Sequence, residues 1–305
     1  MTPFRVKAKN KLKYKIISDI MYDKDKINYL LKNYNKIIVF SIVFIVTFVI
    51  YSYFSLVFDK SLLRVYFLDV GQGDSELIVG PRGNVLLIDT GSNGKVISEI
   101  EKIADLKNKD ISAVVLTHQD LDHNGGFEDV DSAFHVKSLF ITSNYTEKLD
   151  FVNKYLVSQG DTLDFKDFKL EIISPNIKDL GSANHTSIVS ILKYGKYRFI
   201  FMADADKETE RILVSKGYFD DSSKYIDILK LGHHGSDTSS SEVFIKKIKP
   251  EYCIFSVGKD NSYGLPDESV LDLAKKYCKS IYRTDEDGNI GMYTDGKALK
   301  IKKSL

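Results

Sequence analysis

The sequence predicts a mixed α/β domain preceded by a single membrane-spanning helix. Three observations lead to this fold class. Residues 37–58 contain no charged side chain, apolar runs of strand length alternate with helical patterns from Ser61 onward, and no Pro/Gly/Ser-rich tract interrupts that region. With 305 residues, of which 43% are hydrophobic, the chain can bury a sizeable core.

The apolar segment 37–58 reads IIVFSIVFIVTFVIYSYFSLVF. As a helix rising about 1.5 Å per residue it would be about 33 Å long, enough to cross a hydrocarbon core of roughly 30 Å. A helix buried in a soluble core rarely lacks a polar face over this length. A cleaved signal peptide fits poorly, because the stretch is too long and no small-residue cleavage site follows it. We therefore expect a transmembrane helix over 37–58.

Charge is distributed unevenly about this segment. Residues 1–36 hold ten Lys/Arg and three Asp, a net charge of +7, which leaves about −6 for the rest of the chain. Because basic segments beside a span stay in the cytoplasm, we expect a cytoplasmic tail over 1–36 and an extracellular domain over 62–305. The expected location is thus the cell membrane, with a single pass. The lysines of the tail are also expected to contact anionic headgroups.

The extracellular part holds enough strands for two sheets in one domain. Single strands are predicted over 63–70, 75–80, 84–89, 111–118, 169–174, 225–232 and 252–258. The second and third of these form a hairpin around GPRGN, and a further hairpin over 187–204 turns at Tyr194-Gly195. Helices are predicted over 94–108, 206–216, 241–247 and 267–278.

The chain has two cysteines, Cys253 and Cys278. Two cysteines do not make a disulfide framework, and their spacing is not that of a zinc site. Cys253 lies in an apolar strand, and Cys278 lies near the end of a predicted helix. The favoured interpretation is two buried free thiols, with a bridge as the alternative.

The stretch LTHQDLDHNGG, residues 116–126, gathers ligand-type side chains at the end of a predicted strand. The candidates are His118, Asp120, Asp122 and His123. Imidazole and carboxylate groups are ligands that zinc, manganese and iron accept. Packing two acids and two histidines together without a cation would cost repulsion and desolvation. The spacing favours a metal site, with a solvated polar turn as the alternative.

The same arrangement recurs at three further strand ends. VLLIDTG ends in Asp89, FIFMADAD in Asp204, and IDILKLGHHGS in His233 and His234. One histidine on a strand is usually a core residue, but four strands that each end in a ligand-type residue are hard to obtain by chance. The recurrence strengthens the prediction of a metal site.

Taken together, FLDVGQGDSELIV, LIDTG, LTHQDLDHNGG, MADAD and LKLGHHGSDTSSS resemble the metallo-β-lactamase fold. More narrowly, they are similar to the hydrolase-like domain of ComEC-type competence proteins, which are DNA-uptake channels. NSYGLPDESVL and YRTDEDGNI extend the similarity to roughly residues 62–297. One span cannot form a multi-helix DNA pore, so the resemblance concerns that domain alone.

The resemblance implies an αββα sandwich that binds two divalent metal ions, zinc or manganese, along one edge of the paired sheets. His118 and Asp120 would hold the first metal. Asp122 and His123 would hold the second, and Asp204 would bridge both. Asp120 stands where the wider superfamily has a second histidine, but the narrower family also has Asp there.

The resemblance implies two further roles. His234, which is followed by glycine, best matches the last metal ligand, and His233 is its close competitor. The sequence alone does not separate these two histidines. Asp89 resembles the aspartate that orients the ligand loop in this fold.

The sequence departs from the family pattern at two places. The third ligand of the superfamily, a histidine, falls near SANHTSIVSIL. The narrower family shows Asn there with a Ser three residues on, matched by Asn184 and Ser187, and His185 is an alternative imidazole ligand. Leu265 stands where relatives commonly show a histidine, which puts an activity that depends on that histidine in doubt.

The implied reaction is hydrolysis by a water activated between the two metals, with Asp122, His233 and His234 as the catalytic candidates. Whichever of the two histidines is not a ligand would protonate the leaving group. GQGDS, which contains Asp74, and GSDTSSS, which contains Ser236, offer amides and hydroxyls that would hold a phosphate. Ordinary turn and helix-cap chemistry is the alternative for both motifs.

A phosphodiester is the expected substrate, and DNA is one candidate, because two metals can hold both the attacking and the leaving oxygen. The net charge of about −6 on the chain outside residues 1–36 disfavours nonspecific DNA binding. Another surface ester, such as a phosphocholine ester, is the alternative enzymatic substrate. A recognition module that binds metal weakly is the non-enzymatic alternative. The membrane is the one expected partner besides the substrate, and the sequence indicates no protein partner.

Overall fold

The computed structural model describes residues 14–15, 23–24, 26–29, 31–50 and 62–304, apart from 104–105, 107–108, 147, 152, 176–185 and 221–224. The chain divides into two compact units, Met1–Asp59 and Lys60–Leu305. Each unit is described by itself below.

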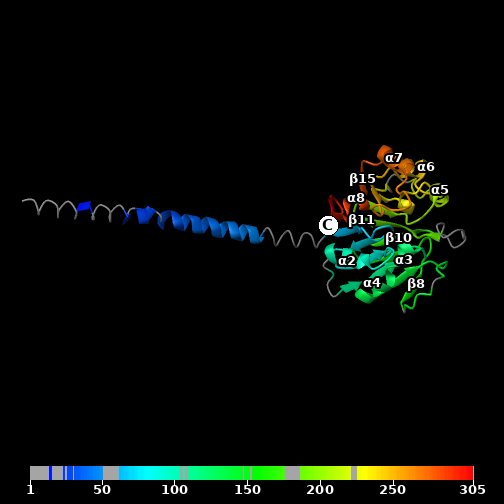
Figure 1. Ribbon diagram of the computed structural model, residues 1–305, viewed down its shortest axis with the longest axis horizontal. Helices are drawn as coiled ribbons and strands as arrows, with labels where there is room; N and C mark the ends of the chain where they lie inside the picture. The colour runs from blue at the N-terminus through cyan, green and yellow to red at the C-terminus, as the bar shows by residue number, and fades with distance from the viewer. Residues whose placement is uncertain are drawn as a thin grey trace, which may run out of the picture. The chain divides into compact units, whose positions relative to one another are not determined.

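The first unit contains a helix over Lys26–Ile50 (Figure 1). It is the one helix in the described part of the chain that is long and apolar enough to cross a membrane. Its apolar side chains are exposed, among them Phe40 and Phe44. By length and composition it is a candidate span, in a position that signal sequences also occupy. Residues 51–58 of the expected span lie outside the described residues.

The second unit contains two large sheets with helices on both sides. In spatial order the first sheet consists of β17 (Leu299–Lys303), β16 (Ile290–Thr294), β1 (Leu63–Phe67), β2 (Glu76–Val79), β3 (Val85–Ile88), β5 (Ala113–Val115), β7 (Leu139–Ile141) and β8 (Lys154–Leu156). The second consists of β15 (Ser280–Arg283), β14 (Tyr252–Phe255), β13 (Ile228–Lys230), β12 (Tyr197–Phe201), β11 (Val189–Tyr194), β10 (Lys169–Ser174) and β9 (Thr162–Asp164). A short parallel pair joins β4 (Asp110–Ile111) to β6 (His135–Val136).

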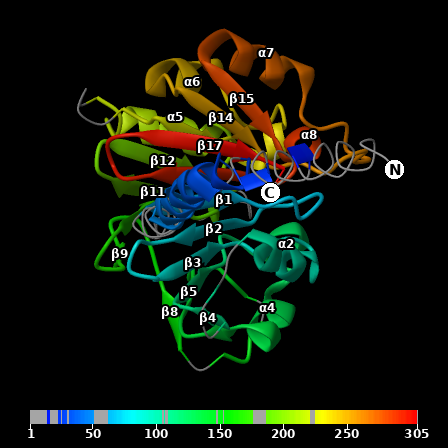
Figure 2. The same ribbon diagram turned by 90° about the vertical axis from the view of Figure 1, so that its left-hand side faces the viewer.

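Helices cover the outer faces of the sheets. The first sheet carries α2 (Lys95–Ile103), α3 (Leu121–Asn124) and α4 (Phe127–Ala133). The second carries α5 (Lys207–Ser215), α6 (Glu242–Ile248) and α7 (Glu268–Tyr277), and α8 (Thr284–Asp287) follows β15. Figure 2 shows α2 and α4 on one side of the paired sheets and α5, α6 and α7 on the other. The expected αββα sandwich is confirmed.

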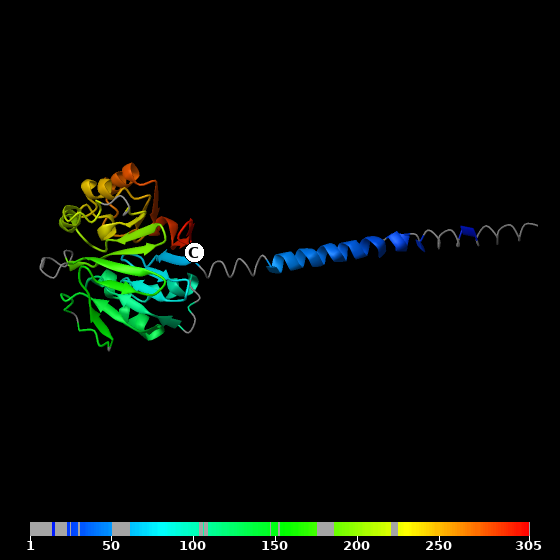
Figure 3. The ribbon, with the colours of Figure 1, turned by 180° about the vertical axis from the view of Figure 1, so that it is seen from behind.

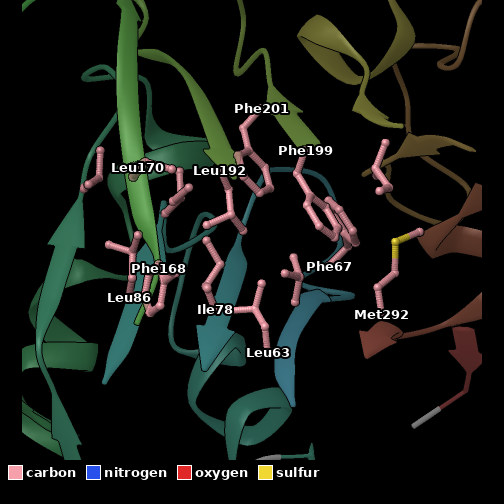
Figure 4. Packing of buried hydrophobic residues seen from close by; sticks show 14 of the residues in the cluster. Leu63, Phe67, Ile78, Leu86, Phe168, Leu170, Leu192, Phe199, Phe201 and Met292 are labelled. Atoms are coloured by element: carbon pink, nitrogen blue, oxygen red, sulfur yellow. The ribbon is translucent and has the colours of Figure 1, made fainter. Parts of the chain in front are cut away.

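The space between the sheets is filled by alternating side chains of the strands. In β1, Leu63, Val65 and Phe67 point into this space, whereas Tyr66 packs on the helical side. Phe199 and Phe201 of β12 meet them from the other sheet (Figure 4). The period of two is the one expected of a strand whose two faces are both covered. Burial on both faces explains why these strands are apolar throughout in the sequence.

Each sheet combines an antiparallel part with a parallel part. β1, β2 and β3 pair in antiparallel fashion, and β3, β5 and β7 in parallel. In the second sheet β10, β11 and β12 are antiparallel, and β12, β13, β14 and β15 are parallel. The carboxyl ends of the parallel strands in one sheet lie at a common edge, which is where α/β folds place their ligands. The polar motifs of the sequence follow four of these strands: β3, β5, β12 and β13.

The described part of the second unit contains a disulfide between Cys253 of β14 and Cys278, which follows α7. The two Cα atoms are 6.0 Å apart. The expectation of two free thiols was therefore wrong. β14 and β15 are parallel, so α7 returns the chain antiparallel to β14 and brings its last turn beside the start of that strand. Spacing along the sequence does not reveal this return.

Replacing both cysteines, Cys253→Ala with Cys278→Ala, should lower the free energy of unfolding by about 3 kcal/mol, because the bridge restricts the unfolded chain. Urea unfolding in oxidising buffer measures this loss. A reductant should destabilise the wild-type chain by a similar amount and leave the double variant unchanged. Two titratable thiols in the folded, oxidised wild type would contradict the bridge.

Glu210 of α5 connects this helix to the start of α6. Its carboxylate accepts hydrogen bonds from the backbone nitrogens of Ser240 and Ser241. Ser241 in turn caps α6 by accepting from the nitrogen of Phe244. Burial outweighs these bonds and raises the pKa of Glu210 to about 7. The folded state therefore binds a proton at pH values where the unfolded chain has lost it.

This pKa predicts a pH-dependent stability difference between wild type and Glu210→Gln. As pH rises from about 4.5 to 7, the free energy of unfolding of the wild type should fall by about 1–3 kcal/mol relative to the variant. The reason is that Glu210 ionises at a lower pH in the unfolded chain than in the folded one. Below pH 4.5 and above pH 7 the difference should be flat. Urea unfolding at several pH values measures it, and a constant difference across this range would contradict the raised pKa.

Candidate metal centre

A cavity of about 390 Å³ opens at the edge where the strands of both sheets end. Its lining combines ligand-type groups with polar and apolar residues of the surrounding loops. The lining residues are Gln72, Ser92, Asp120, Leu121, Asp122, Asp204, His233, His234, Tyr263 and Leu265.

The loop after β5 is held by the carboxylate of Asp89, which follows β3. Asp89 Oδ1 accepts from the nitrogen of Thr117 at 2.8 Å, and Oδ2 accepts from Thr117 Oγ1 at 2.7 Å. Asp89 Oδ2 also lies 2.7 Å from His123 Nδ1. A carboxylate only accepts, so His123 carries its proton on Nδ1 and turns the lone pair of Nε2 away from Asp89.

His118 is oriented in the same way by its neighbour. Thr117 Oγ1 gives its proton to Asp89 and therefore accepts from His118 Nδ1 at 3.0 Å. This leaves the Nε2 lone pair of His118 directed at carboxylates, 3.5 Å from Asp120 Oδ2 and 3.8 Å from Asp204 Oδ2. Two imidazoles from one loop are thus both fixed in a form that suits metal coordination through Nε2.

His234 comes from the second sheet, in the loop Gly232–Gly235 after β13. Its Nδ1 lies 3.0 Å from the carbonyl oxygen of Ser256 and 3.1 Å from Asp74 Oδ1, two acceptors that place the proton on Nδ1. Its Nε2 lies 3.1 Å from Asp122 Oδ2 and 3.7 Å from Asp204 Oδ1. The side chain of His234 is buried.

His233 has a different environment from His234. Its Nδ1 lies 2.8 Å from Thr238 Oγ1, and its Nε2 lies 3.6 Å from Asp204 Oδ2. Its side chain is 29% exposed, against 2% for His234. Both residues have positive φ, 48° and 55°, a costly conformation for residues other than glycine that is often found at functional sites. The geometry thus separates two histidines that the sequence could not.

Asp204 lies at the centre of the group. One carboxylate oxygen, Oδ1, lies 3.1 Å from His123 Nε2 and 3.7 Å from His234 Nε2. The other, Oδ2, faces His233 and His118. A carboxylate that turns one oxygen to each pair of imidazoles has the arrangement required to bridge two ions.

The charges of the group depend on one another. Burial alone would raise the pKa of Asp204, but His123 and His234 hold it well below its usual range. Burial alone would lower the pKa of His234, but Asp204 and Asp74 raise it to about 10. Burial alone would also lower the pKa of His123, but the carboxylates of Asp204 and Asp89 raise it well above its usual value. The buried carboxylates therefore require positive charge beside them, from protons or from metal ions.

Buried atoms that have no hydrogen-bond partner in the described part of the chain test whether the residues fit a metal. Such atoms are costly, and they include His118 Nε2, His123 Nε2 and Asp204 Oδ1. One set of ligand atoms that lie within 4.8 Å of one another comes from His118, His123 and Asp204, and another comes from Asp122, His123 and His234. Nitrogen and oxygen donors in such sets suit zinc or manganese, so the residues fit divalent metals.

The structure brings together seven of the predicted site residues: His118, Asp120, Asp122, His123, Asp204, His233 and His234. Asn184 and His185 lie outside the described residues. Ser187 is buried, and its hydroxyl has no hydrogen-bond partner among the described residues. The nitrogen of Ile188 beside it donates to the carbonyl of Thr117 at 3.0 Å. Ser236 faces Thr238 Oγ1 at 3.0 Å, which is the group that contacts His233.

Sequence reasoning missed Lys230, the last residue of β13. Its ammonium is buried and lies 2.7 Å from Asp74 Oδ2, whose partner oxygen faces His234. Burial would lower the pKa of Lys230, but Asp74 raises it, so the pair is ionic. The buried carboxyl of Glu76 next to this pair has a raised pKa, chiefly from burial. The available signal was a single lysine at the end of an apolar strand.

Gly73 allows the loop of Asp74 to reach the metal centre. Its φ is +132°, and a Cβ atom there would lie 2.2 Å from the carbonyl oxygen of Asp122. The adjacent nitrogen of Asp74 donates to the same oxygen at 3.1 Å. Only glycine allows this approach.

Comparison with known proteins identifies the family. A family model described as "Metallo-beta-lactamase superfamily" matches residues 68–258, which is more than half of the chain. The chain belongs to the metallo-β-lactamase superfamily. Members are typically metal-dependent hydrolases that bind divalent metals, often two.

Two curated relatives extend the comparison. The "ComE operon protein 3" of Bacillus subtilis (strain 168) is 33% identical over 256 residues, which cover 74% of this chain and 32% of the relative. The "Recombination protein 2" of Haemophilus influenzae is 29% identical over 252 residues, covering 81% of this chain and 31% of the relative. The chain spans about a third of the length of these relatives.

A solved structure supports the same superfamily fold. The metallo-β-lactamase fold protein YhfI from Bacillus subtilis aligns with a TM-score of 0.55 at 14% identity. The alignment covers 76% of this chain and 100% of YhfI. At this identity the likeness concerns the fold alone.

The ion pair below the centre yields a prediction. Lys230→Met should destabilise the chain by about 3–5 kcal/mol, because it leaves the carboxylate of Asp74 buried without its cation. Adding Asp74→Asn should recover part of this loss, since the remaining group is neutral. Urea unfolding of both single variants and the double variant gives the coupling energy. Independent, additive losses would show that the two side chains do not depend on each other.

Proposed function

We propose that the domain over 62–305 is a metal-dependent phosphodiesterase with DNA among its substrates. The observation that supports this most is that Asp204, which lines the cavity, turns one carboxylate oxygen to His123 and His234 and the other to His118 and His233. A two-metal site suits phosphodiesters because both the attacking and the leaving oxygen can be held. Two relatives are named "Recombination protein 2" and "Competence protein ComA", and these names support DNA as a candidate substrate.

Each residue of the centre receives a role in this proposal. His118 and Asp120 would hold one ion, Asp122, His123 and His234 would hold the other, and Asp204 would contribute to both. Two divalent cations, zinc or manganese, would supply Lewis acidity there. Asp89 fixes the tautomer of His123, and Asp74 with the Ser256 carbonyl fixes that of His234.

His233 is the proton donor of this proposal. It is the partly exposed histidine of the group, and its Nδ1 is held by Thr238. The water oxygen bonds to phosphorus while the water releases one proton to solvent. The phosphorus–oxygen bond to the leaving group breaks, and the proton from His233 goes to the departing oxygen. Leu265 borders the same cavity, so no imidazole is available at that position for this step.

We place the domain outside the cell. In this proposal residues 1–36 form a cytoplasmic tail, 37–58 span the membrane and 62–305 form the enzyme. The net charge of +7 on the tail supports this orientation. The disulfide between Cys253 and Cys278 supports it independently, since such bridges persist in oxidising compartments.

Metal content and diester hydrolysis of the full chain in detergent test the proposal. Elemental analysis should find about two equivalents of zinc or manganese, and metal-loaded protein should hydrolyse a phosphodiester. Asp204→Asn should lose metal and lower kcat/KM at least about 100-fold, because it removes the shared carboxylate. Asp150→Asn, which changes an exposed carboxylate away from the cavity, is the matched control.

Two outcomes would overturn the proposal. Folded protein that takes up no zinc or manganese would exclude the two-metal hydrolase and favour a recognition module. Metal-loaded protein that spares phosphodiesters but cleaves another ester would keep the metal centre and change the substrate class.

A further inference from the structure

The rim of the metal cavity carries exposed apolar groups. Tyr263 is 72% exposed and Leu121 is 70% exposed, and both line the cavity together with Leu265. The same lining includes the metal-ligand candidates Asp120, Asp122 and Asp204. A large exposed aromatic ring at the entrance of a polar site is a feature of binding surfaces.

The loop that carries Tyr263 is held in place by one side chain. Asn261 Oδ1 accepts from the nitrogens of Tyr263 at 3.2 Å and Leu265 at 3.0 Å. Asn261 Nδ2 donates to the carbonyl of Gly258 at 3.0 Å and to that of Leu265 at 2.7 Å. These four bonds fix the turn from inside, so the exposed ring projects from an ordered loop.

The loop is also fixed to the metal centre. The nitrogen of Gly258 donates to Gln72 Oε1 at 3.1 Å, and a Cβ atom on Gly258 would lie 2.6 Å from the nitrogen of Gln72. Gln72 belongs to the loop that places Asp74 against His234. The backbone that carries Tyr263 is therefore positioned with respect to the ligand residues, so a group that stacks on the ring needs to order only this side chain and not the loop.

The charge of the lining limits what else recognises the substrate. Three carboxylates line the cavity, those of Asp120, Asp122 and Asp204, and no Lys or Arg does so among the described residues. Among the described lining residues, the apolar groups are those of Tyr263, Leu121 and Leu265. These side chains can contact parts of the substrate next to the scissile group without relying on charge.

We propose that Tyr263 is a stacking platform for an unpaired nucleobase beside the scissile phosphodiester, which makes single-stranded nucleic acid the preferred substrate. This inference rests on the proposed phosphodiesterase function. Aromatic rings stack on any base, because every base has a π-face. A base within a duplex is already stacked and paired, so the ring reaches only an unpaired base. Leu121 supplies an apolar contact on the rim.

Hydrolysis of two oligonucleotides by the metal-loaded full chain in detergent tests this. One is a single-stranded oligothymidylate, and the other is an abasic strand with the same number of phosphodiesters. Wild type should favour the strand with bases. Tyr263→Ala should lower kcat/KM on that strand about tenfold or more, as expected for loss of one base stack, and leave the abasic strand and the metal content unchanged.

Two variants serve as controls. Tyr263→Phe keeps the ring and should keep the preference. Tyr225→Ala removes another exposed tyrosine, which does not line the cavity, and should match wild type. Equal cleavage of both strands by wild type, or an equal loss on both strands in Tyr263→Ala, would overturn the stacking inference alone.

A binding measurement distinguishes the stacking site at Tyr263 from the proposed phosphodiesterase activity. Fluorescence anisotropy of the same two strands, measured with wild type and Tyr263→Ala, should show the same preference in the dissociation constants. A chain that binds the strand with bases through Tyr263 but cleaves no phosphodiester would contradict the phosphodiesterase and retain the stacking site. A chain that binds both strands equally would overturn the stacking site.

Discussion

The buried contact between Lys230 and Asp74 joins the two sheets directly beneath the metal centre. A buried ammonium and a buried carboxylate are tolerable only as a pair, so the two sheets are fixed to each other at this point. Asp74 also faces His234, and its backbone nitrogen and oxygen bond to Asp122 and Gly91. One residue thus sets the distance between the second sheet, the helix α3 and the loop that contains Asp89.

This contact explains why the centre takes side chains from both sheets. His118 and His123 follow β5 of the first sheet, whereas Asp204 and His234 follow β12 and β13 of the second. Donor atoms of His118, His123 and Asp204 lie within 4.8 Å of one another, and so do those of Asp74, Asp204 and His234, because the parallel strands of both sheets end at one edge. The orientation of each imidazole is fixed by a different neighbour: Thr117 for His118, Asp89 for His123. A centre built this way depends on sandwich packing more than on any single loop.

Local patterns predicted the ligand candidates and most of the framework. Helix α6 was predicted within one residue and the hairpin turning at Tyr194-Gly195 within three, because turn glycines and helical spacing are local signals. The long-range contacts were not predicted. The bridge from Cys253 to Cys278 depends on the return of α7, and the partner of Lys230 lies 156 residues away. The exposure of Tyr263 likewise follows from the turn closed by Asn261, which no periodicity indicates.

Strands β16 and β17 were also missed as elements of the first sheet. They lie at the end of the chain, yet β16 pairs with β1, the first strand of the domain, from Leu63↔Thr294 to Phe67↔Ile290. In Figures 1 and 3 the red ribbon near the end of the chain lies next to the light-blue ribbon near the start of this unit, as the pairing requires.

This pairing affects how the domain is made. A chain that leaves the ribosome from its N-terminus delivers β1 early, but its neighbour β16 arrives only when about 220 further residues have followed. Until then one edge of β1 has no partner, and the core under Phe67 is open on that side. Completion of the first sheet is therefore a late event of synthesis, and a chain that stops before residue 290 lacks the strand that covers β1.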